Sequence, residues 1–164
     1  MKDTTKKARD LLERSTPLGH YDCGKLCGGK CCKGDQNTGM WLFPSEENFY
    51  KNHPDFTLKE TDGNNGYPMV VCNGTCNRKD RPLACRIYPF YPKIEEDGKV
   101  KVIKDLRGYN SCPVISKDMK PDLKFMRNLR KAARYLIRDK ETLDYIITVN
   151  NEIEEIAGLM MLLK

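Results

Sequence analysis

Cysteine placement constrains this chain more than any other feature of its sequence. Four of the eight cysteines fall within ten positions, in a run that reads YDCGKLCGGKCCKGD over residues 21–35. The glycines between them permit the sharp turns that bring neighbouring sulfur atoms toward one centre. A chain of 164 residues can bury an ordinary apolar core without cross-links. The crowding therefore indicates a disulfide staple, a metal or iron–sulfur site, or a reactive thiol.

The expected compartment separates these three alternatives. The first 22 residues contain no apolar core of a signal peptide, and no stretch of the chain holds the run of about 18 apolar residues that spans a bilayer. We therefore expect a cytoplasmic protein with no membrane partner, in which thiols stay reduced and metal binding is favoured over disulfides. A catalytic thiol needs a nearby base, and histidine is scarce: His20 and His53 are not at ligand spacing.

The other four cysteines occur later, in the segments VCNGTCNRKDRPLACR (71–86) and NSCPV (110–114). Closed zinc sites and common iron–sulfur clusters each use four ligands, so eight cysteines suit either two such sites or one four-thiolate cluster with additional cysteines. All-sulfur ligand sets select zinc, copper(I) or iron–sulfur clusters over magnesium or calcium. The predicted metal ligands are Cys23, Cys27, Cys31, Cys32, Cys72, Cys76, Cys85 and Cys112.

Positively charged residues flank the cysteines. Such cations lower thiol pKa values and can donate hydrogen bonds to sulfur, although a lysine or arginine in a loop can equally be solvated and have no such role. We predict that Arg81 and Arg86 contact the bound cofactor, with Arg86 favoured because it directly follows Cys85.

Periodicity outside the cysteine segments predicts a mixed architecture. Helical spacing of apolar residues indicates helices over residues 4–15, 121–140 and 140–164, the last with an expected break at Asn150–Asn151. Apolar runs at 39–43 and 67–74 predict strands, and residues 86–106 predict a β-hairpin that turns near Asp97–Gly98. Pro89 and Pro92 favour an edge strand or an irregular first arm for this hairpin.

These elements predict an α+β fold with a small irregular cysteine-rich metal-binding core, a short β-hairpin and C-terminal α-helices. The expected organisation is an N-terminal helix and linker (1–20), a cysteine-cluster metal-binding domain (21–115) and a C-terminal helical segment that packs on it (116–164).

A formal charge of +6 and a basic C-terminal helix raise nucleic-acid binding as an alternative. We do not expect a nucleic-acid partner, because no groove-reading motif accompanies the charge and thiolates would reduce it. The basic side chains of this helix are Lys124, Arg127, Arg130, Lys131, Arg134 and Arg138.

The two cysteine segments together resemble the YkgJ-type cysteine-cluster family. The similar features are a first cluster that ends in adjacent cysteines, here CGKLCGGKCC (23–32), and a later cysteine followed by RPLACR and an aromatic–proline stretch, here CNGTCNRKDRPLACRIYPF (72–90). The resemblance covers about residues 21–115. It implies a zinc- or iron-chelating domain whose ligands are Cys23, Cys27, Cys31, Cys32, Cys76 and Cys85, followed by Cys72 and Cys112.

The resemblance sets the expected function. Members of the family are described as zinc- or iron-chelating domains and sometimes as iron–sulfur oxidoreductases, and flagellin lysine N-methylases are similar in carrying such a cluster. We expect a metal-binding protein that holds zinc or an iron–sulfur cluster, of the 4Fe–4S type if a cluster. The alternative is an enzyme, an iron–sulfur oxidoreductase or a protein lysine methylase-like activity. In that case Tyr88, Phe90 and Tyr91 line a substrate pocket; otherwise these aromatic residues pack the hairpin.

Overall fold

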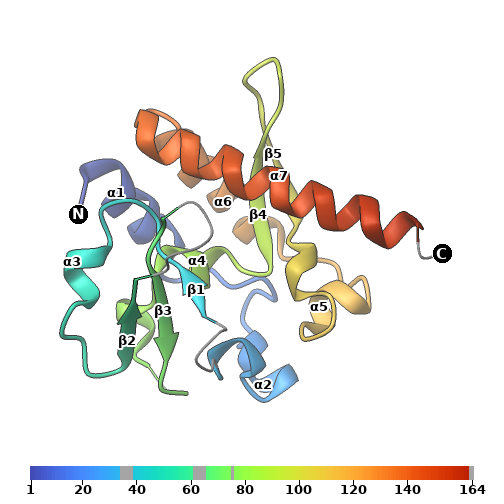
Figure 1. The fold of residues 1–164 in the computed structure, drawn as a ribbon. Helices are drawn as coiled ribbons and strands as arrows, with labels where there is room; N and C mark the ends of the chain where they lie inside the picture. The colour runs from blue at the N-terminus through green and yellow to red at the C-terminus, as the bar shows by residue number, and fades with distance from the viewer. Residues whose placement is uncertain (34–38, 61–65, 75, 163–164) are drawn as a thin grey trace.

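The structure is a computed structural model that describes residues 1–33, 39–60, 66–74 and 76–162. Over these residues it contains seven α-helices, three short 3-10 helices and two small antiparallel sheets (Figure 1). The predicted α+β class is confirmed.

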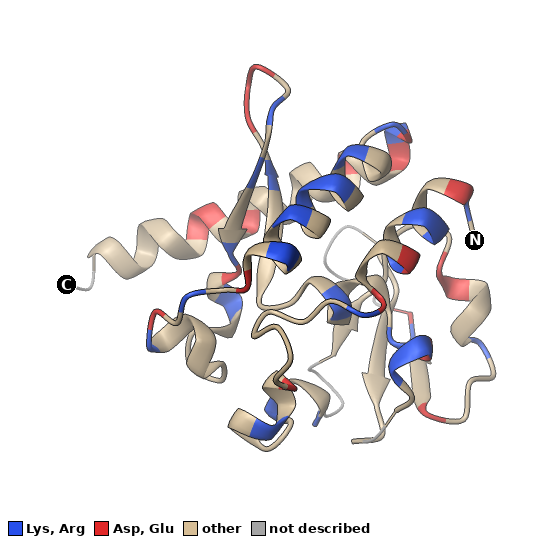
Figure 2. Cartoon of the chain, turned by 180° about the vertical axis from the view of Figure 1, so that it is seen from behind, with Lys and Arg blue, Asp and Glu red and all other residues tan. Residues whose placement is uncertain are grey.

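The C-terminal helices form one side of the main core. α6 (Leu123–Leu136) begins at Asp122, whose side chain accepts a hydrogen bond from the Phe125 N–H, and it buries Leu129 and Leu136 as its periodicity predicts. The N-terminal helix α1 (Asp3–Leu12) packs along α6. The basic residues of α6 are exposed, and the blue segments of the ribbon in Figure 2 show that they recur along the helix. Among the described helices, none is both long enough and apolar enough to cross a membrane.

The predicted hairpin is present, although it is shorter than expected. Its strands are β4 (Phe90–Ile94) and β5 (Val100–Lys104), and Gly98 adopts the positive φ of 76° that the connecting turn requires. The expected strand start at residue 86 is wrong. Residues 83–87 instead form the short helix α4 (Leu83–Ile87), because Pro82 ends the preceding extended segment and Leu83 and Ile87 share one buried helical face.

The expected break near Asn150–Asn151 is also wrong, because α7 (Lys140–Leu162) continues through both residues. The Asn150 side chain is buried against the hairpin, where its amide nitrogen donates to the Pro92 carbonyl at 2.9 Å and its oxygen accepts from the Ile94 N–H at 3.1 Å. Asparagine is usually unfavourable in a helix interior, but here its side chain forms hydrogen bonds with two backbone groups of β4.

Replacing Asn150 by alanine is expected to lower the free energy of unfolding by about 1–3 kcal/mol, because a buried N–H and a buried carbonyl of β4 lose their partner. Asn151→Ala is the matched control: its side chain is exposed on the same helix, and its expected effect is within about 0.5 kcal/mol. Urea denaturation of both variants measures the difference. Equal stabilities would show that the Asn150 hydrogen bonds contribute nothing.

The second sheet carries one of the cysteine segments. Its order is β1 (Met40–Trp41), β3 (Met69–Cys72) and β2 (Phe56–Lys59), all antiparallel. The structure confirms strands within the predicted 39–43 and 67–74 runs, whereas β2 was not predicted. A small apolar cluster lies under this sheet beside α3 (Glu47–Tyr50), with Cys72 and Cys76 packed at its edge.

The remaining elements are short and lie close to cysteines or to the main core. Of the eight cysteines, only Cys112 belongs to the main apolar core, which α1, α4, α6, α7 and the hairpin build. The short elements are α2 (Cys23–Cys27), η1 (Lys30–Cys32), η2 (Arg78–Asp80), η3 (Leu106–Gly108) and α5 (Pro113–Ser116).

Candidate metal centre

All eight cysteines line two small cavities that adjoin each other. The first has a volume of about 50 Å³, and the second has a volume of about 10 Å³. Cys23 and Cys31 line both cavities. The first cavity is also lined by Cys32, Cys72, Cys76 and Cys85. The second is also lined by Cys27 and Cys112. The structure therefore brings together all the residues predicted as metal ligands, from segments up to 89 positions apart (Cys23 to Cys112).

Local backbone geometry explains how the first segment turns back on itself. Gly28 and Gly29 both have positive φ, 63° and 69°, between the end of α2 and the start of η1. Two consecutive residues in this region reverse the chain at little cost only if they are glycines. An isolated β-bridge between Lys33 and Asn73 then joins the first cysteine segment to the end of β3.

The sulfur atoms of the first cavity lie close to one another. Cys31 Sγ lies 3.9 Å from Cys32 Sγ, and Cys72 and Cys76 are close enough to influence the pKa values of Cys32 and Cys72 respectively. However, no three His, Cys, Asp or Glu side chains in the described ranges are arranged as a ready-made metal site.

The ionisation of these thiols depends on their shared surroundings. Burial, followed by the nearby Asp22 charge, raises the pKa of Cys23 to about 11. Burial also raises the pKa of Cys72 to about 11 and raises that of Cys85 further. In contrast, the hydrogen bond from Cys31 lowers the pKa of Cys32 to about 6, and the Arg81 charge acts in the same direction. Without a bound metal ion, burial therefore favours the neutral thiols of Cys23, Cys72 and Cys85, whereas Cys32 favours the thiolate; a bound metal ion favours the thiolate at every ligand.

Arg81 is the cation that faces these sulfur atoms. It lines the first cavity, the neighbouring Cys76 contributes to its raised pKa, and its buried Nε has no hydrogen-bond partner. A buried donor without a partner is costly, and an anionic sulfur cluster would provide the acceptor that Nε lacks.

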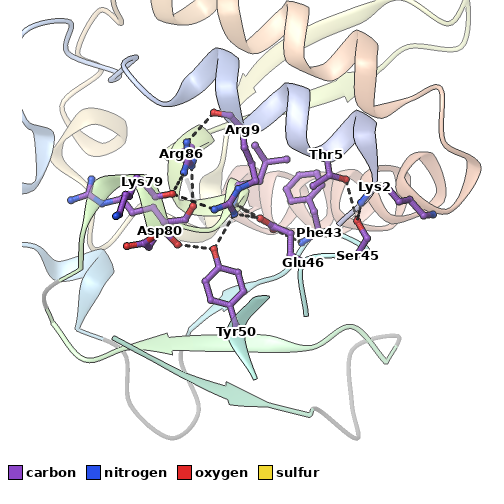
Figure 3. Close-up of polar contacts among 12 residues, drawn as sticks. Lys2, Thr5, Arg9, Phe43, Ser45, Glu46, Tyr50, Lys79, Asp80 and Arg86 are labelled. Atoms are coloured by element: carbon purple, nitrogen blue, oxygen red, sulfur yellow. Dashed lines mark hydrogen bonds and ion pairs between the residues drawn. The ribbon is translucent and has the colours of Figure 1, made fainter. Parts of the chain in front are cut away.

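Arg86 lies elsewhere. Its guanidinium donates to the carbonyl oxygens of Arg81 at 2.9 Å, Arg9 at 2.9 Å and Lys79 at 2.6 Å (Figure 3). Consecutive helical residues point about 100° apart, so Cys85 faces the cavity while Arg86 points to a different side of α4, toward α1. Its cofactor contact stays a prediction; the structure shows a side chain that ties α1 to α4.

A buried polar cluster that the sequence did not suggest supports the Cys85 segment. Glu46 is fully buried and accepts hydrogen bonds from the Arg9 guanidinium, from the Phe43 N–H at 3.1 Å and from the Leu83 N–H at 3.0 Å (Figure 3). Tyr50 accepts from Arg9 at 2.9 Å and donates to the Asp80 carbonyl at 2.8 Å. These bonds fix the start of α4 and the end of η2, on either side of Arg81.

Burial shifts the pKa values of Glu46 and Arg9 in opposite directions, because it favours the neutral form of each group. Burial raises the pKa of the Glu46 carboxyl, and the Arg9 charge and the N–H donors oppose that increase. For Arg9, burial favours the neutral form, but the Glu46 charge outweighs it and the pKa is raised. No sequence pattern identifies this pair, because Glu46 and Arg9 each resemble ordinary surface residues in composition.

Comparison with known proteins gives no further assignment: no family model, no curated protein and no solved structure matches this chain. The resemblance to the YkgJ-type family therefore stays a prediction based on the two cysteine segments.

Proposed function

We propose that this protein is cytoplasmic and that its cysteine thiolates hold either zinc or an iron–sulfur cluster. The observation that carries the proposal is that all eight cysteines line two adjoining cavities. In a reducing compartment such a collection of thiols suits soft-metal coordination. All eight are free thiols in the structure, so none is held in a disulfide.

The residues present fit such a group. The first cavity is larger than the volume of about 10–15 Å³ that one water-sized probe requires. The unpartnered Arg81 Nε supplies a donor for anionic sulfur, and the Cys32 thiol already has a lowered pKa. Ligand side chains must turn toward a common centre on binding, as the short loops between α2, η1 and the end of β3 allow.

The cavities also suggest how the ligands are divided. Four cysteines line only the first cavity, and two line only the second. Assigning the shared pair to the second cavity gives each centre four thiolates, the number that closed zinc sites and 4Fe–4S clusters use. The first centre is then Cys32, Cys72, Cys76 and Cys85. The second is Cys23, Cys27, Cys31 and Cys112.

The chemistry depends on which metal is bound. Zinc in a closed four-thiolate centre contributes folding energy without redox activity, whereas an iron–sulfur cluster supplies one-electron transfer. In either case the chain's own contribution is to hold the thiolates close together and to offset their charge with Arg81. An enzymatic role, as an oxidoreductase or a lysine methylase-like protein, is the second candidate, and an adjoining cavity that reaches Cys31 favours it.

The test is elemental analysis with an absorption spectrum, on protein purified without oxygen. A broad band near about 400 nm with iron and sulfide would identify a cluster, and colourless protein with one or two zinc ions per chain would identify a structural centre. Protein that contains neither metal and takes up neither on reconstitution would overturn the proposal.

Two single variants test the ligand assignment. Cys76→Ala is expected to remove the metal of the first centre and to leave that of the second, and Cys112→Ala is expected to do the reverse. Each should therefore reduce the metal content by about half. Ser111→Ala, adjacent to Cys112 but without a sulfur ligand, is the matched control and should keep the full content. Loss of all metal in both cysteine variants would instead indicate one shared centre.

A further inference from the structure

A larger cavity, of about 460 Å³, adjoins the first cysteine cavity. This volume lies within the range of small-molecule sites in proteins. The two cavities have four lining residues in common: Cys31, Gly39, Met40 and Tyr88. A molecule bound in the larger cavity would therefore lie beside the cysteines. A reaction between such a molecule and a metal centre at the cysteines rests on the proposed metal function. Binding of the molecule in the larger cavity does not depend on that function.

The walls of this cavity are rich in aromatic side chains. Trp41 and Tyr88 are half-buried, so their rings remain partly accessible to a ligand. Phe90, Tyr91 and Tyr145 are buried and form the wall behind them. The sequence left open whether Tyr88, Phe90 and Tyr91 line a pocket or pack the hairpin. In the structure they do both, since all three line this cavity and pack in the main core. Aromatic walls favour a ligand that has a flat ring, because rings stack with offset or edge-to-face geometry.

The charge of the lining is positive. Lys30 and Lys33 are exposed on the cavity rim, and neither forms an ion pair with any residue that the structure describes. Asp105 is the single carboxylate among the described lining residues, and it is neutralised by Arg107, whose Nε and terminal nitrogen donate to it at 2.8 and 2.7 Å.

Arg107 is held in place before any ligand arrives. The bidentate bond to Asp105 fixes the plane of the guanidinium, whose carbon lies 5.4 Å from the centre of the Trp41 ring. The side chain keeps 30% of its surface exposed. An arginine fixed in this way provides a preorganised planar surface next to an aromatic wall, while Asp105 and Glu152, which lies 3.6 Å away, balance its charge.

We propose that this cavity binds a small organic anion with a planar ring. The ring stacks against Trp41 and Tyr88, and the anionic group lies toward Lys30 and Lys33. Complementary charge and shape select this ligand over a neutral or cationic molecule of the same size.

The sequence contains one tryptophan, Trp41, so its fluorescence reports directly on the cavity. We would titrate the purified protein with 2-naphthoate and with 2-naphthamide, which has the same ring without the charge. Emission is corrected for ligand absorption, and calorimetry gives a second readout. We expect saturable binding of naphthoate at about 1 mM or below, at least about tenfold tighter than the amide.

Variants separate this site from general surface binding. Lys30→Gln/Lys33→Gln should reduce the preference for naphthoate to less than about threefold, and raised salt should weaken naphthoate more than naphthamide. Lys124→Gln/Lys131→Gln removes two exposed lysines from α6, which does not line the cavity, and should leave the preference unchanged. Absence of saturable binding, equal affinity for the two probes, or equal effects of the two double variants would overturn the proposal.

Metal content is measured on the same samples, so the two proposals can fail separately. Protein that contains no metal, takes up none on reconstitution and still prefers naphthoate would overturn the metal function and support the anion site. Metal-loaded protein that shows no preference would overturn the anion site alone.

Discussion

Glu46→Gln is expected to destabilise the protein by about 3–5 kcal/mol, one of the largest effects of any single substitution in this chain. The glutamine has the same shape but leaves the Arg9 guanidinium without a counter-charge in a place where the side chains of Glu46 and Arg9 are 0% and 7% exposed. The amide also has only one oxygen to accept hydrogen bonds, whereas Glu46 uses both oxygens toward Arg9, Phe43 and Leu83. Urea denaturation at neutral pH measures the loss.

The matched control is Glu154→Gln. Glu154 is also paired with a cation, Lys93 at 2.6 Å, but its side chain is 52% exposed. Water solvates both charges there, so the expected change is less than about 1 kcal/mol. If the two variants lose the same stability, the buried pair contributes no more than a surface pair and the argument from burial is wrong.

Removing the metal is expected to open the cysteine segments selectively while the helical core stays folded. The prediction rests on the proposed metal function and on the composition of the main core, which includes Cys112 but none of the other cysteines. Without the ion, α2, η1 and the end of β3 have few buried apolar contacts to replace it, since no residue of α2 or η1 is buried. Hydrogen exchange followed by mass spectrometry, before and after anaerobic chelation, measures the effect.

We expect the amides of these segments to exchange at least about 100-fold faster after chelation, and those of α6 and α7 to change by less than about tenfold. Return of the native metal should restore protection and serves as the control for damage by the chelator. Equal loss throughout α6 and α7 would show that the metal holds the whole fold. Unchanged exchange everywhere would show that the cysteines hold no metal that stabilises them.

The regular elements were predictable where one periodicity dominates over many residues. α6 and the β4–β5 hairpin follow from helical spacing and from a glycine at the turn. The errors have local causes. The predicted break in α7 considered the helix propensity of Asn150 but not the two hydrogen bonds that it makes with β4. β2 was missed because four residues between loops show too little alternation to indicate a strand.

The candidate site was predictable in its residue types but not in its arrangement. Sequence spacing selects the eight cysteines, and the structure brings them to two cavities. Spacing does not indicate which way a side chain points, so it favoured Arg86 over Arg81, although Arg81 lies at the sulfur atoms. The larger cavity was only partly foreseen, because Trp41 of β1 and the Asp105–Arg107 pair at η3 are far apart in the sequence and only the fold brings them together.

The Arg9–Glu46–Arg86 cluster has a consequence for the kinetics of folding. Its members join positions that are 37 and 77 residues apart, so the intervening chain must close large loops before these bonds can form. Contacts of this kind form late and are weakly developed at the folding barrier. Substitutions in the cluster should therefore accelerate unfolding far more than they slow folding, so that this cluster sets the lifetime of the native state rather than the speed of reaching it.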